Sequence, residues 1–237
     1  QLVNLLPNTT YYVRAYATNA NGTSYSNELS FTTPIVHNVP CPGTPTVTDA
    51  DGNMYNTVQI GDQCWMKENL RTTKFASGMS MDRLTATTGN NPGYWPSTIS
   101  ESMFYNEYAL YTRMHDVTMN ALHVQGVCPD GWHIPTPAEY QTLFSNLGGM
   151  NVAASKLKAT SSWTASAGIT ATDESGFSLL PEGMYNTLYG GVHYLYNRCY
   201  LITTDNATKY ELDYNSNTIT TIGSAQSPVG FALRCMK

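Results

Sequence analysis

The amino-acid sequence of 237 residues predicts an α+β fold, in which short antiparallel strands surround one main helix and a partial all-β module comes first. Three observations lead to this prediction. Apolar residues alternate with polar ones, as strands require, in short runs near both ends of the chain. A complete helix-start pattern occurs once, at Thr136. A proline-rich stretch at residues 34–45 then separates the first strands from the rest, so we expect two domains.

A β-hairpin is expected over residues 5–33. Apolar and polar residues alternate through 11–17, which predicts a strand with one buried face. The connection at 19–22, Asn-Ala-Asn-Gly, supplies residues that tolerate positive φ and so favours a tight turn. The alternation returns at Leu29 and Phe31, in the second strand.

The hairpin motif LxPxTxYxVRAxA, followed by NxxGTSYSNExSFTT, resembles the last two strands of a fibronectin type III domain. The resemblance implies that Tyr11 is the corner tyrosine, whose hydroxyl bonds nearby backbone. Because two strands cannot bury a sandwich core, we expect residues 1–33 to be the C-terminal hairpin of such a domain, with its other strands upstream in a longer protein. Residues 34–45, with four prolines and a glycine, are expected to be a linker.

Further strands are expected at 46–48, 55–60 and 64–66, where runs rich in Thr, Val and Tyr flank the turn sequence DADGN at 49–53. The spacing of acidic and amide residues in this turn is similar to the start of a calcium loop. The glycine comes too early, however, and no glutamate closes the loop at the required distance. We therefore interpret the sequence as turn chemistry and expect no metal site.

Residues 78–102 show no sustained period and are expected to be a long irregular insertion. The main helix is expected to start at Thr136-Pro137-Ala138-Glu139, which combines an N-cap threonine, proline at the first helical position and a capping-box glutamate. Gly148 and Gly149 end it, and a shorter helix is expected at 151–158. From residue 176 onward the pattern predicts short strands and polar turns.

Three longer blocks resemble the Fibrobacter succinogenes major paralogous domain (FISUMP) family. They are TVTDADGNMYNTVQIGDQCWMKENLRTTKF at 46–75, GVCPDGWHIPTPAEYQTLFSNLGG at 126–149, and ESGFSLLPEGMYN at 174–186 with the ending GFALRCMK at 230–237. The resemblance implies a C-type-lectin-like domain over residues 46–237, which closes by pairing its last strand with its first and carries binding on loops. It implies an activity of ligand binding rather than catalysis.

The five cysteines are too widely spaced for a metal site, and their odd number leaves at least one unpaired. Free buried thiols in a reducing compartment are one interpretation. The family resemblance implies the other, in which Cys128 pairs with Cys235 and Cys41 with Cys64. The Glu-Pro-Asn and Trp-Asn-Asp motifs of calcium-dependent lectins are absent from the sequence, so we do not expect calcium-mediated sugar binding.

Several classes of function are disfavoured by the sequence. Charged residues make up only 12% of the chain, the net charge is −5, and no basic run offers an electrostatic source for nucleic-acid binding. No stretch reaches the roughly 18 apolar residues of a membrane span, so no membrane insertion is expected. GxSxG, HExxH and Walker motifs are absent, and His133 is interpreted as a packing residue. We expect no enzyme and no cofactor.

The segment 185–208, YNTLYGGVHYLYNRCYLITTDNAT, is predicted to form a binding surface. Five tyrosines with His, Arg and Asn give the mixture favoured by antibody-like paratopes, because Tyr offers contact area at low entropic cost. Alternatively, these tyrosines are ordinary strand residues. The candidate contact residues are Tyr185, Asn186, His193, Tyr194, Tyr196, Asn197, Arg198, Tyr200 and Asp205, with Tyr214 and Asn215 from the next hairpin.

The same segment lacks Lys, Glu, Gln, Met and Trp, although these five types supply 34 residues of the chain. Mutagenesis of adenines in AAY codons cannot produce those five types. The segment is therefore similar to the variable regions of proteins that retroelements diversify, many of which display the variation on C-type-lectin-like domains. This gives the hypothesis of a diversified variable protein.

Together these observations predict an extracellular adhesin or receptor-binding protein on a bacterial surface or phage virion. Its partner would be a cell-surface protein or glycan. A homo-oligomer within a larger fibre or surface protein is compatible with this prediction. Two alternatives stay open: a structural surface or virion decoration module without its own ligand, and an enzyme of the formylglycine-generating type.

Overall fold

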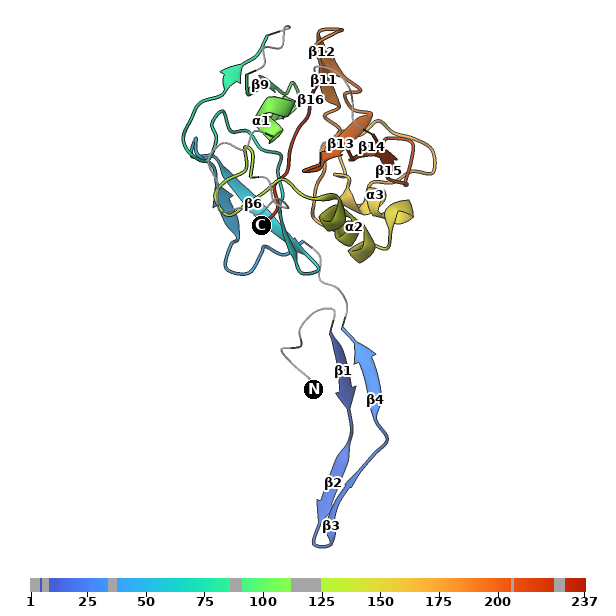
Figure 1. Cartoon of the computed structure of the whole chain (residues 1–237). Helices are drawn as coiled ribbons and strands as arrows, with labels where there is room; N and C mark the ends of the chain where they lie inside the picture. The colour runs from blue at the N-terminus through green and yellow to red at the C-terminus, as the bar shows by residue number, and fades with distance from the viewer. Residues whose placement is uncertain are drawn as a thin grey trace. The chain divides into compact units, whose positions relative to one another are not determined.

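The computed structural model describes residues 5, 9–33, 38–85, 91–111, 125–205, 207–223 and 229–237. The chain divides into two units, Gln1–Val36 and His37–Lys237, each with its own internal contacts (Figure 1). The division falls inside the stretch expected as a linker. Cys41, in the second half of that stretch, is buried and bonded within the large unit, so this half belongs to it.

The small unit is a long β-hairpin. Strand β1 (Thr10–Val13) pairs with β4 (Leu29–Thr32), and β2 (Tyr16–Asn19) pairs with β3 (Gly22–Tyr25) around the expected turn. The expected buried face is wrong: Tyr12, Tyr16 and Tyr25 are exposed and no residue of the described strands is buried. A two-stranded ribbon has no second sheet against which to bury a face.

The large unit begins with a three-stranded antiparallel sheet, β5 (Thr46–Thr48), β6 (Met54–Ile60) and β7 (Gln63–Met66), as expected. The DADGN turn joins the first two strands. Its Asp49 carboxylate accepts bonds from the main-chain N–H groups of Asp51 and Asn53, both at 2.9 Å, and from the Tyr55 hydroxyl. The carboxylate is therefore engaged by its own turn, in line with the turn interpretation.

The region expected to be irregular contains a small sheet. Strands β8 (Asp82–Arg83), β9 (Gly93–Pro96) and β10 (Met103–Tyr105) pair side by side, and helix α1 (Glu107–Tyr111) follows. Each strand is too short to show a periodic pattern, which is why no strand was expected in this region. Trp95 and Phe104 anchor the sheet by packing with Ala232 in a small buried cluster.

Both expected helices are present. Helix α2 (Pro137–Asn146) starts with the predicted capping box, in which the Thr136 side chain accepts from the Glu139 N–H and the Glu139 carboxylate accepts from the Thr136 N–H. Helix α3 (Met150–Leu157) follows after two glycines with positive φ. None of the described helices has the length and apolar character to cross a membrane.

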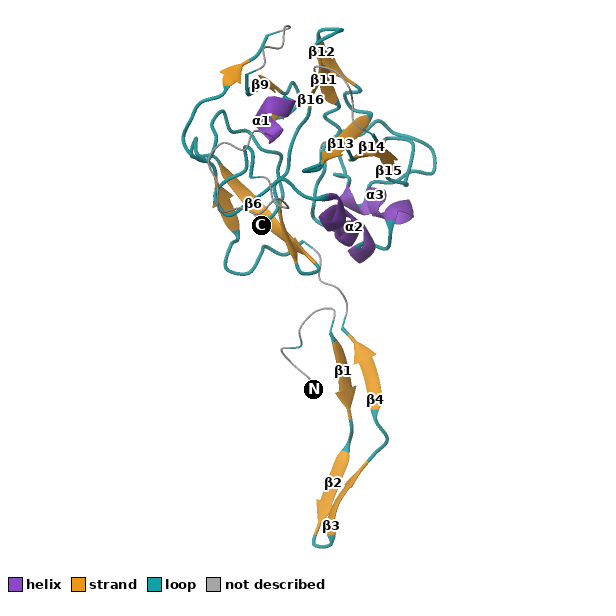
Figure 2. Ribbon diagram, in the orientation of Figure 1, coloured by secondary structure: helices purple, strands orange, loops and turns teal. Residues whose placement is uncertain are grey.

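The last third of the chain forms two small sheets, drawn as orange arrows in Figure 2. In one, β11 (Met184–Asn186) lies between β12 (Gly191–His193) and β16 (Val229–Gly230). In the other, β14 (Lys209–Asp213) lies between β13 (Arg198–Ile202) and β15 (Thr220–Ile222). Figure 1 shows β11 and β12 at the end of the large unit opposite α2.

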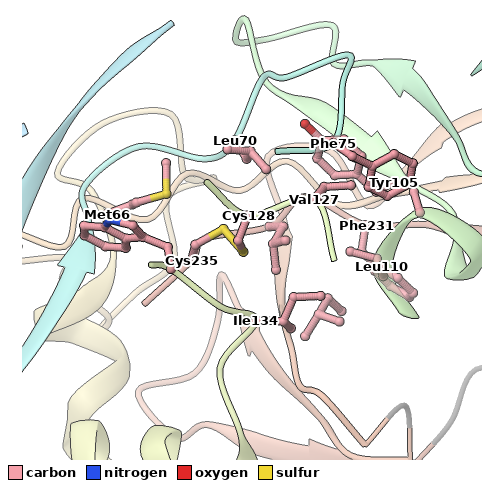
Figure 3. Close-up of a cluster of buried hydrophobic side chains, with 14 of the residues drawn as sticks. Met66, Leu70, Phe75, Tyr105, Leu110, Val127, Cys128, Ile134, Phe231 and Cys235 are labelled. Atoms are coloured by element: carbon pink, nitrogen blue, oxygen red, sulfur yellow. A yellow bond between two sulfur atoms is a disulfide. The ribbon is translucent and has the colours of Figure 1, made fainter. Parts of the chain in front are cut away.

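The C-terminal segment runs through the middle of the large unit. Phe231, Leu233 and Cys235 belong to one buried cluster, shown in Figure 3, while Met236 belongs to a second cluster between β7 and the helices. Met236 pairs with Trp65 and with His133. The end of the chain therefore closes against β7, the third strand of the large unit, rather than against its first.

Two disulfides join Cys41 to Cys64 and Cys128 to Cys235, with Cα atoms 5.6 and 5.8 Å apart. These are the pairs that the family resemblance implied. The second bond lies inside the cluster of Figure 3 and fastens the C-terminal segment to the loop before α2. Cys199 is free and buried.

Candidate ligand-binding surface

The four residues 194–197, which we call the tyrosine turn, connect β12 to β13. Tyr194 and Tyr196 have φ angles of 61° and 66°, in the left-handed region. Their side chains are 45% and 47% exposed. A bulky residue with positive φ is an outlier that costs roughly 1–3 kcal/mol and persists only where the surroundings fix it. Two such residues in one exposed turn therefore need a strong mount.

Main-chain hydrogen bonds hold the turn from inside and outside. We call the segments that bond to it from outside, residue 164 and residues 181–183, the mount. Within the turn, the N–H groups of Asn197 and Arg198 both donate to the Tyr194 carbonyl, at 3.0 and 2.9 Å. From outside, the Tyr196 N–H donates to the Pro181 carbonyl at 2.9 Å, and the Thr164 N–H donates to the Tyr196 carbonyl at 2.8 Å. The backbone of Tyr196 is thus held on both sides by segments distant in sequence.

Gly183 allows residues 181–183 to lie close to the backbone of the tyrosine turn. Its φ is +67°, and a Cβ atom at this position would lie only 1.9 Å from the His193 carbonyl oxygen. Its N–H donates to the Arg198 carbonyl at 2.8 Å. The sequence requires glycine here because both the backbone conformation and the approach of the turn exclude any side chain.

Arg198 links the turn to the sheet behind it. Its guanidinium lies 4.5 Å from the centroid of the Tyr194 ring, and its nitrogens lie 2.9 Å from Glu211 and 2.8 Å from Asp213. Two carboxylates balance the charge of Arg198. Its guanidinium holds the Tyr194 ring in place through a cation–π contact. It offers little free positive charge to a ligand.

The tip of the β11–β12 hairpin extends the aromatic surface. Tyr189 is 76% exposed and its ring centroid lies 5.6 Å from that of His193, which in turn lies 6.4 Å from that of Tyr194. Leu188 beside it is also exposed. Of the seven exposed large apolar or aromatic side chains in the described large unit, four lie within residues 188–196. This clustering marks an interaction surface.

Tyr185 and Asn186 support this surface from below. The Tyr185 ring stacks on Trp95 with centroids 4.6 Å apart, and only part of it reaches solvent. Asn186 is buried, and its side-chain oxygen accepts the Leu188 N–H at 2.9 Å. The prediction of Asn186 as a contact residue is therefore wrong, because its side chain shapes the hairpin tip from within.

Tyr200 is a second correction, because it is only 6% exposed. Strand β13 is buried on both faces: Cys199 and Leu201 pack into the cluster around the helices, while Tyr200 and Ile202 pack into the cluster of Figure 3. The Tyr200 ring meets Phe231 edge-on at 5.5 Å. For this residue the alternative of an ordinary packed strand tyrosine holds.

The other candidates divide between two places. Tyr214 and Asn215, in the β14–β15 turn, lie beside the tyrosine turn, because the Tyr214 N–H donates to the Asn197 carbonyl at 2.7 Å. Asp205 lies at the opposite end of the β13–β14 hairpin, and its carboxylate accepts bonds from Thr203 and Thr208 within its own turn. The structure therefore does not bring Asp205 to the surface formed by the other candidates.

Sequence reasoning omitted Leu188 and Tyr189 from the candidate residues. A signal for them was present, since apolar residues followed by Gly190 and Gly191 occupy the tip of a hairpin, where no partner layer can bury them. The positive φ angles at Tyr194 and Tyr196 had no signal, because glycine and asparagine are the usual markers of that conformation.

Residues considered for catalysis are engaged in packing. His133 Nε2 lies 3.0 Å from the Glu139 carboxylate, and both residues are at the start of α2. Although burial raises the pKa of Glu139, bonds from His133 and Thr136 outweigh it and lower that pKa to about 2. Burial raises the pKa of the Cys199 thiol to about 12. Across the described residues, no three His, Cys, Asp or Glu side chains group as a metal site would need.

A comparison with family models matches residues 58–237 to the Fibrobacter succinogenes major domain. Comparisons with curated proteins and with solved structures found no match. The matched region includes the tyrosine turn, its mount and both partners of the Cys128–Cys235 bond.

Proposed function

The chain belongs to the Fibrobacter succinogenes major domain family, and from this premise we propose that it is a non-enzymatic ligand-binding protein. Its binding surface is the tyrosine turn with Tyr189 and His193. The observation that carries this proposal is the pair of exposed tyrosines in the left-handed conformation, of which Tyr196 is held by main-chain bonds on both sides. A fold that maintains strain at an exposed site uses that geometry for recognition.

The chemistry of the surface favours a partner recognised by shape, ring stacking and hydrogen bonds. Tyrosine combines a large apolar ring with a hydroxyl and loses little conformational entropy on binding. Because Glu211 and Asp213 match the charge of Arg198, long-range attraction contributes little. We propose that the protein acts on the extracellular surface of a bacterium or phage, as an adhesin for a cell-surface protein or glycan.

We also propose the finer fold assignments: a C-type-lectin-like domain for residues 46–237 and a fibronectin type III hairpin for residues 1–33. One principal helix and the two disulfides support the first, although the C-terminal segment closes against β7 rather than against the first strand. The turn at 19–22 and the Tyr11–Phe31 ring stack, 5.9 Å between centroids, support the second. In this arrangement the lectin-like unit carries the binding surface.

The test is retention of fluorescently labelled protein on a panel of intact bacterial strains. The variant replaces Tyr189, Tyr194 and Tyr196 with alanine. We expect its binding to fall at least about 30-fold, because the loss of a cluster of aromatic anchors costs about 2 kcal/mol or more. The melting temperature should not fall, since these side chains project from the core.

The small unit provides a matched control, because Tyr12, Tyr16 and Tyr25 are three exposed residues of the same type, each more exposed than Tyr194 and Tyr196. Replacing these three with alanine should leave cell retention unchanged. Equal loss in both variants would mean that tyrosine content, rather than the mounted turn, causes adhesion. Retention that survives the first variant on every strain bound by the native protein would remove the proposal.

The burial of strand β13 limits where the diversification hypothesis can apply, so we restrict it to the exposed part of residues 185–208. Residues 199–202 are buried on both faces of β13, so random substitution there would disrupt two core clusters. The positions that tolerate exchange lie within 187–197, at the hairpin tip and tyrosine turn. Sequencing of the gene across a clonal population should place its variable codons in that interval, and codon variation centred on β13 would contradict the hypothesis.

The two alternatives have less support. A formylglycine-type enzyme needs a reactive thiol, yet four cysteines are bonded in pairs and the fifth has a strongly raised pKa. A decoration module would bury the tyrosine turn in an assembly. Protection of Tyr194 and Tyr196 from chemical modification in the native particle, without binding to any cell, would favour that alternative.

A further inference from the structure

A polar pocket lies next to residues 181–183, the segment whose main-chain groups bond to the tyrosine turn. Its volume is about 450 Å³, within the range of small-molecule sites. All but two of its lining residues, Ala159 and Leu180, have polar side chains, which suit a ligand that makes several hydrogen bonds. The polar ones are Lys67, Glu68, Asn69, Arg71, Ser100, Glu101, Ser102, Thr160, Ser161, Asp173, Ser178, Glu182 and Arg234.

The carboxylate of Glu182 forms part of the pocket lining although the residue is only 1% exposed. The hydroxyls of Ser100 and Ser102 donate to its two oxygens, each at 2.5 Å. The serines are also bonded to each other, since Ser100 Oγ accepts the Ser102 N–H at 3.0 Å and lies 2.8 Å from Ser102 Oγ. Each carboxylate oxygen of Glu182 retains a lone pair after the two serine bonds, so this part of the pocket presents two acceptors to a ligand that carries donors.

Arg234 and Asn69 form another part of the lining. Arg234 Nε donates to the Asn69 side-chain oxygen at 2.6 Å, and the guanidinium also donates to the Ser178 carbonyl and lies 4.6 Å from the Phe177 ring centroid. The Asn69 amide nitrogen is buried and has no hydrogen-bond partner among the described residues. A buried donor without a partner is destabilising, and an acceptor brought by a ligand would remove that cost.

The charged residues of the lining carry both signs, three cationic and four anionic, so the pocket does not favour an ionic ligand of either sign. Arg71 lies 3.8 Å from Glu101, while Lys67 and Glu68 are each hydrogen-bonded at 2.8 Å to an asparagine side chain, Asn38 and Asn56. The remaining capacity for hydrogen bonds resides in hydroxyls, such as those of Thr160 and Ser161 at the mouth.

We propose that this pocket binds a neutral, polyhydroxylated ligand of the sugar class. A sugar hydroxyl both donates and accepts, so it complements both the Glu182 carboxylate oxygens and the Asn69 amide donor. A neutral sugar of one or two rings carries no net charge and needs no ionic partner in the lining. The inference does not depend on the function proposed for the tyrosine turn.

The pocket and the turn share one segment of backbone. Glu182 lies between Pro181, whose carbonyl accepts the Tyr196 N–H, and Gly183, whose N–H donates to the Arg198 carbonyl. The two sites share this backbone segment but have no lining or contact residue in common, so their ligands can be tested one at a time.

The experiment uses saturation-transfer NMR with glucose, galactose, mannose, N-acetylglucosamine, maltose and cellobiose, each at about 10 mM. For at least one sugar we expect a dissociation constant of about 1 mM or lower. Ser161→Trp blocks the mouth without removing any described hydrogen bond, and Glu182→Gln replaces an acceptor with a donor at constant size. Both should weaken binding about tenfold or more. Thr170→Trp, an exposed residue outside the pocket, is the matched control and should bind as the native protein does.

Three outcomes would overturn the proposal: no transfer from any sugar to the native protein, unchanged binding by Ser161→Trp, or binding lost equally in Thr170→Trp. The triple alanine variant of Tyr189, Tyr194 and Tyr196 separates the two sites. It should bind sugar normally while failing to adhere to cells. Sugar binding that disappears in that variant and persists in Ser161→Trp would assign the sugar to the turn instead.

Discussion

Two groups of tyrosines in this protein are exposed and very differently supported. Tyr12, Tyr16 and Tyr25 in the hairpin of the small unit are 65–72% exposed, and Tyr194 and Tyr196 in the tyrosine turn are 45% and 47% exposed. The hairpin tyrosines lie on a two-stranded ribbon with no buried residue among its described strands. The tyrosine turn is mounted on a core with two disulfides and is held by main-chain bonds from residues 164, 181 and 214. Exposure alone therefore does not define a binding surface, since a fixed geometry is also required.

The largest expected effect comes from removing the Cys128–Cys235 disulfide, which fastens the C-terminal segment of the large unit. Cys128→Ala with Cys235→Ala opens a bond between residues 107 apart in sequence, and should lower the free energy of unfolding of the large unit by about 4–5 kcal/mol. Cys41→Ala with Cys64→Ala opens a bond over 23 residues and should cost about 3 kcal/mol. Urea unfolding followed by tryptophan fluorescence measures both, because all four tryptophans lie in the large unit.

The unpaired Cys199→Ala variant is the matched control, because it makes a similar small cavity without opening a cross-link. It should cost about 1 kcal/mol. Hydrogen exchange should quicken at the Tyr196 amide in the Cys128 and Cys235 variant and stay unchanged in the hairpin of the small unit. Equal destabilisation by all three variants would show that cavity formation dominates and that the cross-link contributes nothing to the mount.

A smaller effect is expected from Lys158, which supports the turn next to the tyrosines. Its side chain is buried, and Nζ donates to the carbonyls of Asp213 and Ser216, both at 2.7 Å. Burial lowers the pKa of this lysine to about 8, partly offset by the Asp213 charge. The unfolded chain therefore binds more protons than the folded chain between about pH 8 and pH 10.4, and stability contributed through this group rises with pH across that window.

Comparison of the native protein with Lys158→Met isolates the effect of Lys158 titration on stability. Titration of the tyrosines also changes stability at high pH, but it contributes equally to both proteins and cancels in the difference. The difference in free energy of unfolding between them should grow by about 2 kcal/mol from pH 7 to pH 9.5. Urea titrations at three pH values across that range give the measurement. A difference that stays constant or shrinks as pH rises would mean that burial does not depress the lysine pKa.

The sequence predicted those elements whose signals are local. The capping box at Thr136 and Glu139 and the turn at 19–22 each follow from a few adjacent residues, and the structure confirms both. The burial of Tyr200 could not be predicted, because it depends on Phe231, which the C-terminal segment brings to that face of β13. The pocket was not visible either, since its lining residues are drawn from Lys67 to Arg234.

The candidate surface was predicted as a region and mispredicted at single positions. The density of tyrosines located it, because residue composition reports on contact chemistry. Which side chains point outward depended on backbone conformation at Tyr194 and Tyr196, and that conformation is imposed by the contacts of Pro181 and Gly183 rather than by the turn's own residues.

The smallest effect separates a mounted tyrosine from an ordinary exposed one. Because Tyr194 and Tyr196 have positive φ, glycine should relieve backbone strain at either position, so Tyr194→Gly should be about 1 kcal/mol more stable than Tyr194→Ala. At Tyr16, in the middle of the hairpin pairing, the order should reverse, because glycine weakens a strand relative to alanine by roughly 0.5–1 kcal/mol. Urea unfolding measures the first pair of variants, and amide exchange of the Thr18 and Thr23 N–H groups measures the second. If alanine and glycine rank the same way at both sites, the left-handed conformation does not persist in solution, and the tyrosine turn has no more fixed geometry than the hairpin.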